Sequence, residues 1–427
     1  MQLSSDISRK VLIIAPQPFF TNRGTPLNVR AVCARLADLG YQVHLLALPH
    51  GEAIRMRGVR IHRCLKIPGV RSVPIGFSLR KTLYDGLLLL SACYLSLCFD
   101  FDVYHGIEEA GVIAGFVGLV RGRPYVVDMD SDMMEQLRGT PVEKCPGLVN
   151  LLAKLEAFFI RRATAVVTVC ATLTAKARSQ AASRRVFQIE DCPVEGDVPS
   201  PETLDVFRRK LSLIGKKVVL YTGNLEPYQG VDLLIESFAC YLRRTDALSA
   251  AQLVIVGGTE SQLVDAREVA ERLGVPADRI SFLGQQPLEE MASFMALADV
   301  LISPRRLGTN TPLKIYSYMS AGRPIVATNI VSHTQVLSEE CAYLASPSAE
   351  SLCAAMARAL DDGSGAEAER AGKIAETLKR VETLYSRQCF NSKIQQLYSF
   401  VMRPETRLAD ESALDALAAS ELGAKSE

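Results

Sequence analysis

The chain has 427 residues, of which 48% are hydrophobic and 22% are charged, and its formal net charge is +1. This length allows two or three domains with sizeable cores, and a charge so close to neutral offers no general attraction for nucleic acid. The 11 cysteines are scattered and form no C-x-x-C pair, so the usual zinc and redox motifs are excluded and a reducing cytoplasm is expected.

The N-terminal segment predicts a β-loop-α-β unit. A polar start over 1–10 leads directly into the apolar run 10–15, which is typical of a parallel strand buried on both faces, and no signal peptide is expected. Thr25 and Pro26 supply a cap and a first residue for the next helix, and a strand over 42–48 follows. The sequence contains no G-x-G-x-x-G or G-x-x-x-x-G-K-[ST] pattern, so dinucleotide binding of the usual kind and P-loop chemistry are disfavoured.

Residues 51–81 are strongly basic, with eight Arg or Lys and one Glu. They precede the apolar run 86–98, whose 13 residues are too few for a membrane span, which needs about 20. Two interpretations stay open: a membrane-facing edge made of the basic segment 51–81 and the apolar helix over 86–98, and a basic loop over a buried helix. The other strands and helices expected in this half cover 59–64, 79–97, 102–105, 110–119, 125–128, 149–161, 165–169 and 186–189.

The β/α alternation restarts after an acidic, proline-rich segment, which predicts an α/β fold with two doubly wound domains facing a cleft. We expect a Rossmann-like domain over 1–195, a linker over 196–210 and a second Rossmann-like domain over 211–385. A helix over 386–403 is expected to pack back on the first domain, and the acidic tail 404–427 to be disordered. The elements expected in the second half cover 216–222, 231–242, 252–256, 280–283, 287–297, 299–303, 324–328, 348–360 and 366–402.

The segment 303–328 reads as a strand end, a polar loop, a short helix and the next strand. Thr311 is expected to cap this helix, Pro312 to begin it and Gly322 to end it. The loop would then point free backbone N–H groups beyond the strand ends, which predicts an anion site, although an ordinary α/β crossover has similar caps. The cations expected near that site are Arg305, Arg306 and Lys314.

The opening strand and loop, together with the segments 220–235, 254–258, 282–284 and 311–328, resemble the GT-B-fold glycosyltransferases of family 4. The resemblance covers about residues 10–400 and is most specific in the second half. It implies a retaining transferase whose second domain binds a nucleotide-sugar and whose first domain binds a glycan or lipid-linked acceptor. It also implies that no metal or cofactor is needed beside the nucleotide-sugar co-substrate.

The resemblance further implies where the donor binds, with the base and ribose against the strand-end glycines and the diphosphate at the loop before the helix. Members usually carry Arg and Lys where this chain has Asn224 and Gln229, and two glutamates where it has Thr309 and Ser317. The residues expected to bind the donor are Arg23, Gly24, Thr25, Gly223, Asn224, Gln229, Gly257, Gly258, Gly284, Gln285, Thr309, Asn310, Thr311, Lys314 and Ser317.

Four residues of the first domain are candidate catalytic groups. His105 matches the first histidine of the family's His-x-His, although a strand-end histidine bonded to backbone is the simpler interpretation. Glu108 is a candidate carboxylate on the acceptor side, although acids also favour a helix start. Asp128 and Asp130 resemble the D-x-D of metal-dependent transferases, but those enzymes have another fold, so we expect a general base here rather than a metal site.

Two other functions stay open at this point. The neutral residues at the four donor positions favour a nucleotide-sugar-binding scaffold with weak activity. The GT-B fold also supports enzymes that are not transferases, such as nucleotide-sugar epimerases.

Overall fold

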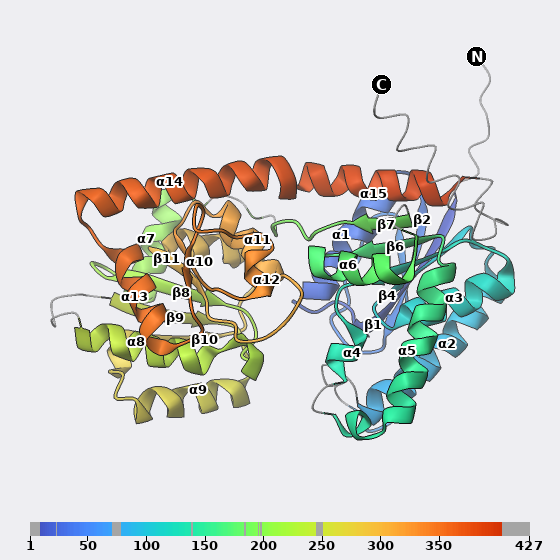
Figure 1. The fold of residues 1–427 in the computed structure, drawn as a ribbon, viewed down its shortest axis with the longest axis horizontal. Coiled ribbons are helices and arrows are strands. Elements are labelled where there is room, and N and C mark those ends of the chain that lie inside the picture. The colour runs from blue at the N-terminus through green and yellow to red at the C-terminus, as the bar shows by residue number, and fades with distance from the viewer. Residues whose placement is uncertain are drawn as a thin grey trace, which may run out of the picture. The chain divides into compact units, whose positions relative to one another are not determined.

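The computed structural model describes residues 9–22, 24–70, 78–137, 140–182, 185–194, 196, 199–244 and 251–403. The chain divides into two compact units (Figure 1). The first unit consists of residues 1–190 and 390–427, and the second consists of residues 191–389. The first unit is therefore discontinuous, because its last segment follows the whole of the second unit.

The first unit contains a parallel sheet with the strand order β3-β2-β1-β4-β5-β6-β7. The order reverses direction between β1 and β4, and such a switch point commonly lies beside a ligand site in doubly wound sheets. The central strands are buried because helices cover both faces of the sheet. The described strands are β1 (Lys10–Pro18), β2 (Gln42–Leu48), β3 (Val59–Arg63), β4 (Val103–Ile107), β5 (Tyr125–Met129), β6 (Ala165–Thr168) and β7 (Val186–Gln188).

The helices of this unit form two groups. Helices α2, α3, α5 and α6 share one hydrophobic core with the sheet, in which Leu88, Ala114 and Leu173 are buried. Helices α1 and α15 pack together, with Arg35 Nε donating to the Asn391 carbonyl oxygen at 3.2 Å. The bounds are α1 (Gly24–Asp38), α2 (Leu79–Cys98), α3 (Ala110–Arg121), α4 (Met133–Gln136), η1 (Pro141–Lys144), α5 (Pro146–Arg162), α6 (Ala171–Gln180) and α15 (Arg387–Val401).

The second unit contains a second parallel sheet, with the order β10-β9-β8-β11-β12-β13. Its strands are β8 (Lys217–Thr222), β9 (Ala251–Val256), β10 (Ile280–Gly284), β11 (Val300–Ser303), β12 (Ile325–Thr328) and β13 (Tyr343–Ala345). Its helical segments are α7 (Pro201–Lys210), η3 (Pro227–Gln229), α8 (Val231–Arg244), α9 (Glu260–Arg272), η4 (Ala277–Arg279), η5 (Leu288–Glu290), α10 (Met291–Leu297), α11 (Leu313–Ser320), α12 (Val331–Thr334), α13 (Ala349–Leu360), α14 (Ser364–Arg380) and the π-helical η6 (Val381–Tyr385).

The two parallel sheets confirm the predicted α/β fold, but several elements are missing from the prediction. Helix α6 has little apolar periodicity and buries few side chains, among them Leu173 and Ala177. Helix α9 carries a capping box, in which the side chains of Thr259 and Gln262 bond each other's backbone N–H, and this signal was available in the sequence. Strand β13 has three residues, which is too short for a periodic pattern.

Part of the segment predicted as a linker is helical. Residues Pro201–Lys210 form α7, because Pro201 occupies the first position and the Ser200 hydroxyl accepts from the Thr203 N–H at 3.3 Å. The tail 404–427 lies outside the described residues. Among the residues that the structure does describe, no helix is both long and apolar enough to cross a bilayer.

Candidate active site

The loop before α11 is shaped by Arg305, whose side chain turns back into the loop. Its Nε donates to the Leu307 carbonyl oxygen at 2.7 Å, and one Nη donates to that of Asn310 at 2.9 Å. Gly308 adopts a φ of 129°, and a Cβ there would lie 2.1 Å from the Arg305 guanidinium. Only glycine can therefore approach so closely. Arg305, which we predicted near the anion, thus holds the loop in its conformation.

Lys314 is the cation that the first turn of α11 presents. Its ammonium nitrogen lies 3.1 Å from Gln229 Oε1 and 4.0 Å from the centre of the Tyr221 ring. No ion pair formed among the described residues includes Lys314. The surrounding protein, and secondarily the nearby Arg305 guanidinium, lower the pKa of Lys314 well below its usual range. Because the residue keeps partial contact with solvent, an incoming anion could reach it and supply the missing negative partner.

Arg306 does not share that position. Its guanidinium pairs with Asp232 at 2.9 Å, and both side chains are about half exposed. A solvated pair of this kind contributes little to stability. The predicted cation cluster thus separates into a loop-shaping arginine, a surface arginine and one enclosed lysine.

The predicted cap of α11 is wrong. Pro312 occupies the cap position, so Thr311 lies outside the helix and its buried hydroxyl has no partner among the described residues. Two other predicted donor residues make contacts within the second unit. The Thr309 carbonyl accepts from Gln335 Nε2 at 2.8 Å, and the Ser317 hydroxyl accepts from the Val194 N–H at 3.2 Å. A cap prediction likewise fails at Thr25, because α1 already begins at Gly24.

Glycines bring the carboxyl ends of β8, β9 and β10 close together. The Gly257 N–H donates to the Gly284 carbonyl oxygen at 2.7 Å, and the Gly223 N–H donates to that of Val256 at 3.0 Å. Gly257 has a φ of 113°, and a Cβ there would lie 2.0 Å from the Gly223 carbonyl oxygen. Gly258 follows with a φ of 86°. These glycines therefore let the strand ends approach each other closely at the place where the donor residues were predicted, and the Leu225 side chain packs against Gly258.

The remaining predicted donor residues are less informative. The Asn224 amide oxygen accepts from the Glu226 N–H at 3.3 Å, so this side chain stabilises its own turn. Gln285 is exposed at the end of β10. Gly24 and Thr25 lie in the first turn of α1, in the first unit. Arg23 lies outside the described residues.

His105 belongs to a buried cluster of three side chains in the first unit. Its Nδ1 lies 2.8 Å from the Tyr398 hydroxyl of α15, and its Nε2 lies 3.1 Å from Asp128 Oδ2 on the neighbouring strand β5. Both His105 and Asp128 are almost fully buried. The alternative of a bond to backbone is therefore wrong, since side chains hold both ring nitrogens. Because both side chains are shielded from solvent, this arrangement favours positioning roles, and their catalytic roles stay predictions.

Replacing Tyr398 with phenylalanine is expected to destabilise the first unit by about 1–3 kcal/mol, because a buried ring nitrogen of His105 loses its partner. Tyr343→Phe is the matched control, since its buried hydroxyl has no partner among the described residues. That change should alter stability by less than about 0.5 kcal/mol. Urea denaturation followed by circular dichroism measures both, and equal effects would contradict the structural role of the Tyr398–His105 bond.

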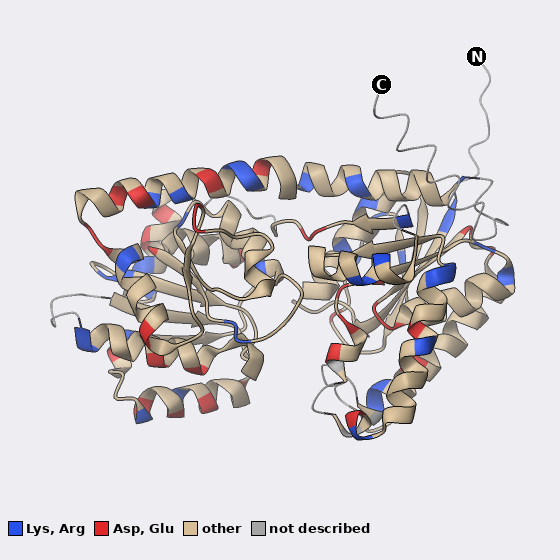
Figure 2. Cartoon of the chain, viewed as in Figure 1, with Lys and Arg blue, Asp and Glu red and all other residues tan. Residues whose placement is uncertain are grey.

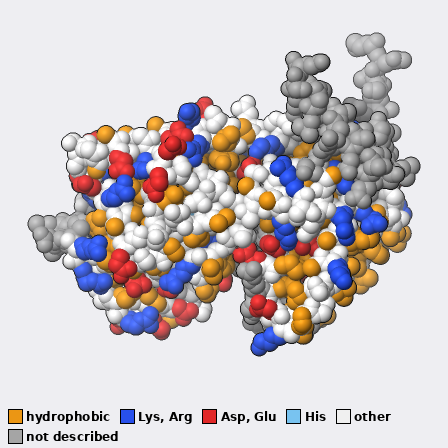
Figure 3. Space-filling model, viewed as in Figure 1, with side chains coloured by type: hydrophobic (Ala, Val, Ile, Leu, Met, Phe, Trp, Pro, Cys, Tyr) orange, Lys and Arg blue, Asp and Glu red, His pale blue; other side chains and the backbone are white. Residues whose placement is uncertain are grey.

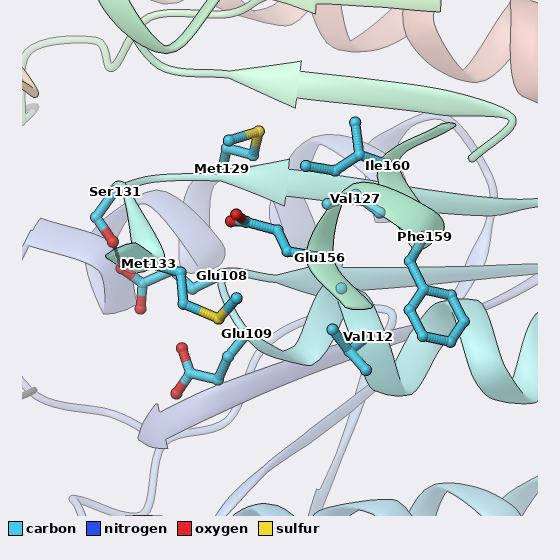
Figure 4. Close-up of a pocket in the computed structure, with 11 residues that line it drawn as sticks. Glu108, Glu109, Val112, Val127, Met129, Ser131, Met133, Glu156, Phe159 and Ile160 are labelled. Carbon is cyan, nitrogen blue, oxygen red and sulfur yellow. Dashed lines mark hydrogen bonds between the residues drawn. The ribbon is translucent and has the colours of Figure 1, made fainter. Parts of the chain in front are cut away.

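A pocket lies at the carboxyl ends of β4 and β5, between α3 and α5 (Figure 4). The space between its walls measures about 400 Å³, a volume that includes the open solvent at its mouth. Its carboxylates come from Glu108, Glu109 and Glu156, and its other walls are mainly apolar. Glu108 has a φ of 51°, and its carboxylate accepts from Gln17 and, at 2.8 Å, from the Ser131 hydroxyl.

Two lysines balance the acids around this pocket. Lys81 pairs with Glu109, and Lys176 bridges Asp132 at 2.7 Å and Glu156 at 3.3 Å. Burial raises the pKa of Glu156, while Lys176 opposes that shift. A carboxylate in such a setting can exchange a proton with a bound hydroxyl more readily than a solvated one.

The structure thus brings one of the four predicted catalytic residues, Glu108, into a pocket. Asp130 instead accepts a hydrogen bond from Asn28 Nδ2 at 3.4 Å, within the same unit. Glu156 and Ser131 were missed, although Glu156 is the single acid in the apolar sequence of α5. Within the described residues, no group of three or more His, Cys, Asp or Glu side chains is arranged to hold a metal ion.

The basic segment 51–81 is partly used within the first unit. The Arg63 guanidinium donates to backbone carbonyl oxygens over 49–52, and Lys81 is enclosed between Asp85 and Glu109. Arg71 lies outside the described residues. The excess of charge counted along the sequence therefore overstates the charge that this segment offers to a partner.

Two doubly wound parallel sheets, the second with closely packed glycines at its strand ends, form the architecture of the GT-B class. The family profile described as glycosyl transferases group 1 matches residues 216–362, and that of the glycosyl transferase 4-like domain matches residues 23–189. The chain belongs to the GT-B-fold glycosyltransferases of family 4.

Two curated relatives illustrate the similarity in sequence. The putative glycosyltransferase YtcC of Bacillus subtilis is 29% identical over 215 residues, which are 47% of this chain and 49% of YtcC. The phosphatidyl-myo-inositol mannosyltransferase of Mycolicibacterium smegmatis is 28% identical over 188 residues, which are 43% of this chain and 45% of that protein. The matches thus span about half the length of these relatives or less.

Solved structures show the same fold over almost the whole chain. The sucrose-phosphate synthase of Thermosynechococcus elongatus superposes with a TM-score of 0.73 at 18% identity, covering 92% of this chain and 98% of its own. Anabaena HepE in complex with UDP-glucose gives a TM-score of 0.71 at 15% identity, covering 91% and 99%. At these identities the likeness concerns the fold.

Proposed function

We infer that this protein transfers a sugar from a nucleotide-sugar to a glycan or lipid-linked acceptor, with retention of configuration. The observation that carries this proposal is Lys314, an enclosed amine beside Gln229 with no acidic partner among the described residues. An amine in this setting binds an anion strongly, because the anion restores the charge that burial suppresses. It lies in the first turn of α11, where the helix N-terminus also favours negative charge.

A nucleotide diphosphate is the anion that fits this arrangement. As the bond to the sugar breaks, negative charge develops on the leaving diphosphate, and fixed N–H groups and cations stabilise it. Lys314 and the N-terminus of α11 would supply that stabilisation without a divalent ion. Gly223 and Gly257 keep the ends of β8 and β9 in close contact, and a Cβ built at Gly223 would lie 3.4 Å from Lys314 Nζ, so these strand ends adjoin the proposed diphosphate site. The solved complex of HepE with UDP-glucose supports a nucleotide-sugar as donor.

Lys314 also compensates for a departure from the family pattern. Gln229 occupies the position where the resemblance places a lysine, and Lys314 Nζ lies within hydrogen-bond distance of its amide oxygen. An amine that a bound anion can charge therefore lies in the same neighbourhood but on another element. Asn224, Thr309 and Ser317 are neutral, so the contacts with the sugar ring would differ from those usual in the family.

The pocket of Glu108 and Glu156 is the proposed acceptor site. Its carboxylates and the Ser131 hydroxyl can bind hydroxyl groups of an acceptor, and its apolar walls can take a less polar portion. The name of the mycobacterial relative, a phosphatidyl-myo-inositol mannosyltransferase, supports a lipid-linked acceptor. His105 and Asp128 would support this site by holding the ends of β4 and β5 in position.

A panel of nucleotide-sugars, incubated with the protein and analysed by mass spectrometry, tests the proposal. We expect slow release of a nucleoside diphosphate from one donor, faster release with an acceptor, and no change on addition of a chelator. Retention would appear as the same anomeric configuration in donor and product. Isomerised nucleotide-sugar would identify an epimerase instead.

The neutral residues at the four donor positions favour a second candidate, a scaffold that binds a nucleotide-sugar without turnover. Calorimetric binding of one donor, with no release of nucleoside diphosphate under any acceptor condition, would support that candidate. No binding of any donor would contradict both.

A further inference from the structure

Helices α2, α3 and α5 of the first unit expose an unusual number of large apolar side chains. The outward face of α2 is exposed at Leu83, Leu90, Tyr94 and Leu97, where Leu97 is 81% exposed. The sequence from 86 to 99 contains no charged residue that could make this face soluble. The other exposed apolar side chains of this surface are Phe116, Leu119 and Val120 on α3 and Leu148, Leu151, Leu155 and Phe158 on α5.

These side chains form one surface rather than scattered positions. The three helices are neighbours, since α3 packs against both α2 and α5. On α5 the exposed residues follow each other at spacings of three or four, which places them on one side of the helix. Figure 3 shows hydrophobic side chains gathered over the region of α2 and α5. Exposed apolar patches of this extent mark interaction sites on folded proteins.

Basic residues outnumber acidic ones around the apolar surface (Figure 2). Arg121 ends α3, Lys154 lies on α5, and Arg161 and Arg162 end α5, all of them exposed. The Arg162 guanidinium lies 4.2 Å from the centre of the Phe158 ring, so its charge stays close to the apolar surface. Of the neighbouring acids, Asp85 and Glu109 are partly buried and both pair with Lys81, whereas Asp100 after α2 and Glu143 before α5 are exposed.

We propose that the α2–α3–α5 surface docks on an anionic lipid bilayer. An apolar centre with a basic border matches acyl chains below negatively charged headgroups. A second copy of the chain is a poorer occupant, because a two-fold contact would bring the same basic border against itself. No helix among the described residues is suited to cross the bilayer, so the contact is an adsorption to one leaflet.

This surface keeps the apolar helix of the predicted membrane edge, adds α3 and α5 to it, and depends less on the basic segment 51–81. Lys66 and Arg80 are exposed and can add positive charge, but Arg63 and Lys81 are engaged within the unit. The pocket begins within one turn of the surface, since Val112 precedes Phe116 by one turn and Glu156 follows Leu155 directly. A lipid-linked acceptor could thus present its head at the pocket, a step that rests on the proposed function.

Vesicle flotation tests the docking surface without requiring any enzymatic activity. The full chain is mixed with vesicles of phosphatidylcholine containing about one third phosphatidylglycerol, and with vesicles of phosphatidylcholine alone. We expect flotation with the anionic vesicles and about tenfold weaker partitioning to the neutral ones. The double variant Leu151→Glu, Leu155→Glu should reduce partitioning to the anionic vesicles by about tenfold or more, because it places two acids in the apolar centre.

The matched control is Val206→Glu, Val264→Glu, which introduces the same charges at exposed apolar positions of the second unit. It should float like the unaltered chain. Circular dichroism shows whether each variant is folded, and Lys154→Glu, Arg161→Glu provides a second pair that leaves the apolar residues intact. Absence of flotation, or equal flotation of all variants, would overturn the proposal.

The surface would instead be assigned to a second copy of the chain if the protein does not float but sediments as a dimer, and if Leu151→Glu, Leu155→Glu abolishes that dimer. Donor binding measured by calorimetry should be unchanged in the Leu151→Glu, Leu155→Glu variant, which separates this proposal from the proposed function.

Discussion

Replacing Lys314 with methionine is expected to weaken nucleotide-sugar binding by about 100-fold, which corresponds to roughly 2–3 kcal/mol. The change removes the ammonium group beside Gln229 and keeps a side chain of similar length. Isothermal titration calorimetry with the preferred donor measures the loss. The folded state should not be weakened, because the amine has no acidic partner among the described residues and its burial opposes folding.

The pH dependence of both properties follows from the direction of the Lys314 pKa shift. The pKa of the folded protein lies below that of the unfolded chain, so between the two values the unfolded chain binds more protons. The Lys314 contribution therefore makes stability rise with pH in that window, and the methionine variant should lack this slope. A bound diphosphate restores the charged amine, so binding should take up a proton and affinity should fall as pH rises. Calorimetry in buffers of different ionisation enthalpy detects that proton.

Lys217→Met serves as the control, since Lys217 lies at the start of β8 and pairs with Asp362 away from the strand ends. It should change donor affinity by less than about twofold, because this solvated pair contributes little. If Lys314→Met binds the donor as well as the unaltered chain does, the lysine is not part of the diphosphate site.

Replacing Gly257 with alanine is expected to destabilise the second unit by more than about 3 kcal/mol. The added Cβ would lie 2.0 Å from the Gly223 carbonyl oxygen, and the φ of 113° at this position is unfavourable for alanine. The backbone around the ends of β8 and β9 would have to move, which would also displace the proposed nucleotide-binding surface. Denaturation with urea, combined with hydrogen exchange of the β8 and β9 amides, measures the effect.

The variant Gly274→Ala distinguishes the effect of steric crowding by the added Cβ from the effect of a positive φ. Gly274 has a φ of 70°, but no atom lies within 4 Å of a Cβ built there. This change should cost only about 1 kcal/mol. If the two alanine variants were equally stable, the close approach of Gly257 to Gly223 would not be important for the fold.

Most of the fold could be predicted because its signals are local. The runs that form β1, β2 and β8 are continuously apolar, as strands buried on both faces must be. Helix α6 lacked such a signal. The start of α11 shifted by one residue, because Pro312 adopts the extended backbone of the cap position and no side chain caps the helix.

The site could be predicted only where residue type restricts the backbone. The glycines at the strand ends indicated that backbone segments lie close together there. Lys314, in the first turn of a predicted helix, indicated a site for an anion. The role of Arg305 could not be predicted from the sequence. Its guanidinium bonds carbonyl oxygens of the loop, and it reaches them only because Gly308 has no side chain. The partner of His105 could not be found either, since Tyr398 lies 293 residues further along the chain. Such a contact follows from the tertiary fold alone.

The discontinuity of the first unit has a consequence for how the protein is made. Phe390, Leu397 and Tyr398 of α15 are buried in that unit, yet they emerge from the ribosome after the entire second unit. In most proteins the N-terminal domain is the first to finish folding during synthesis. Here residues 191–389 can finish folding first, because the first unit still lacks its last helix when they have been made. Until translation reaches Val401, the sheet of the nascent first unit remains uncovered along the side that α15 will occupy, and a ribosome stalled short of that point would carry it in that state.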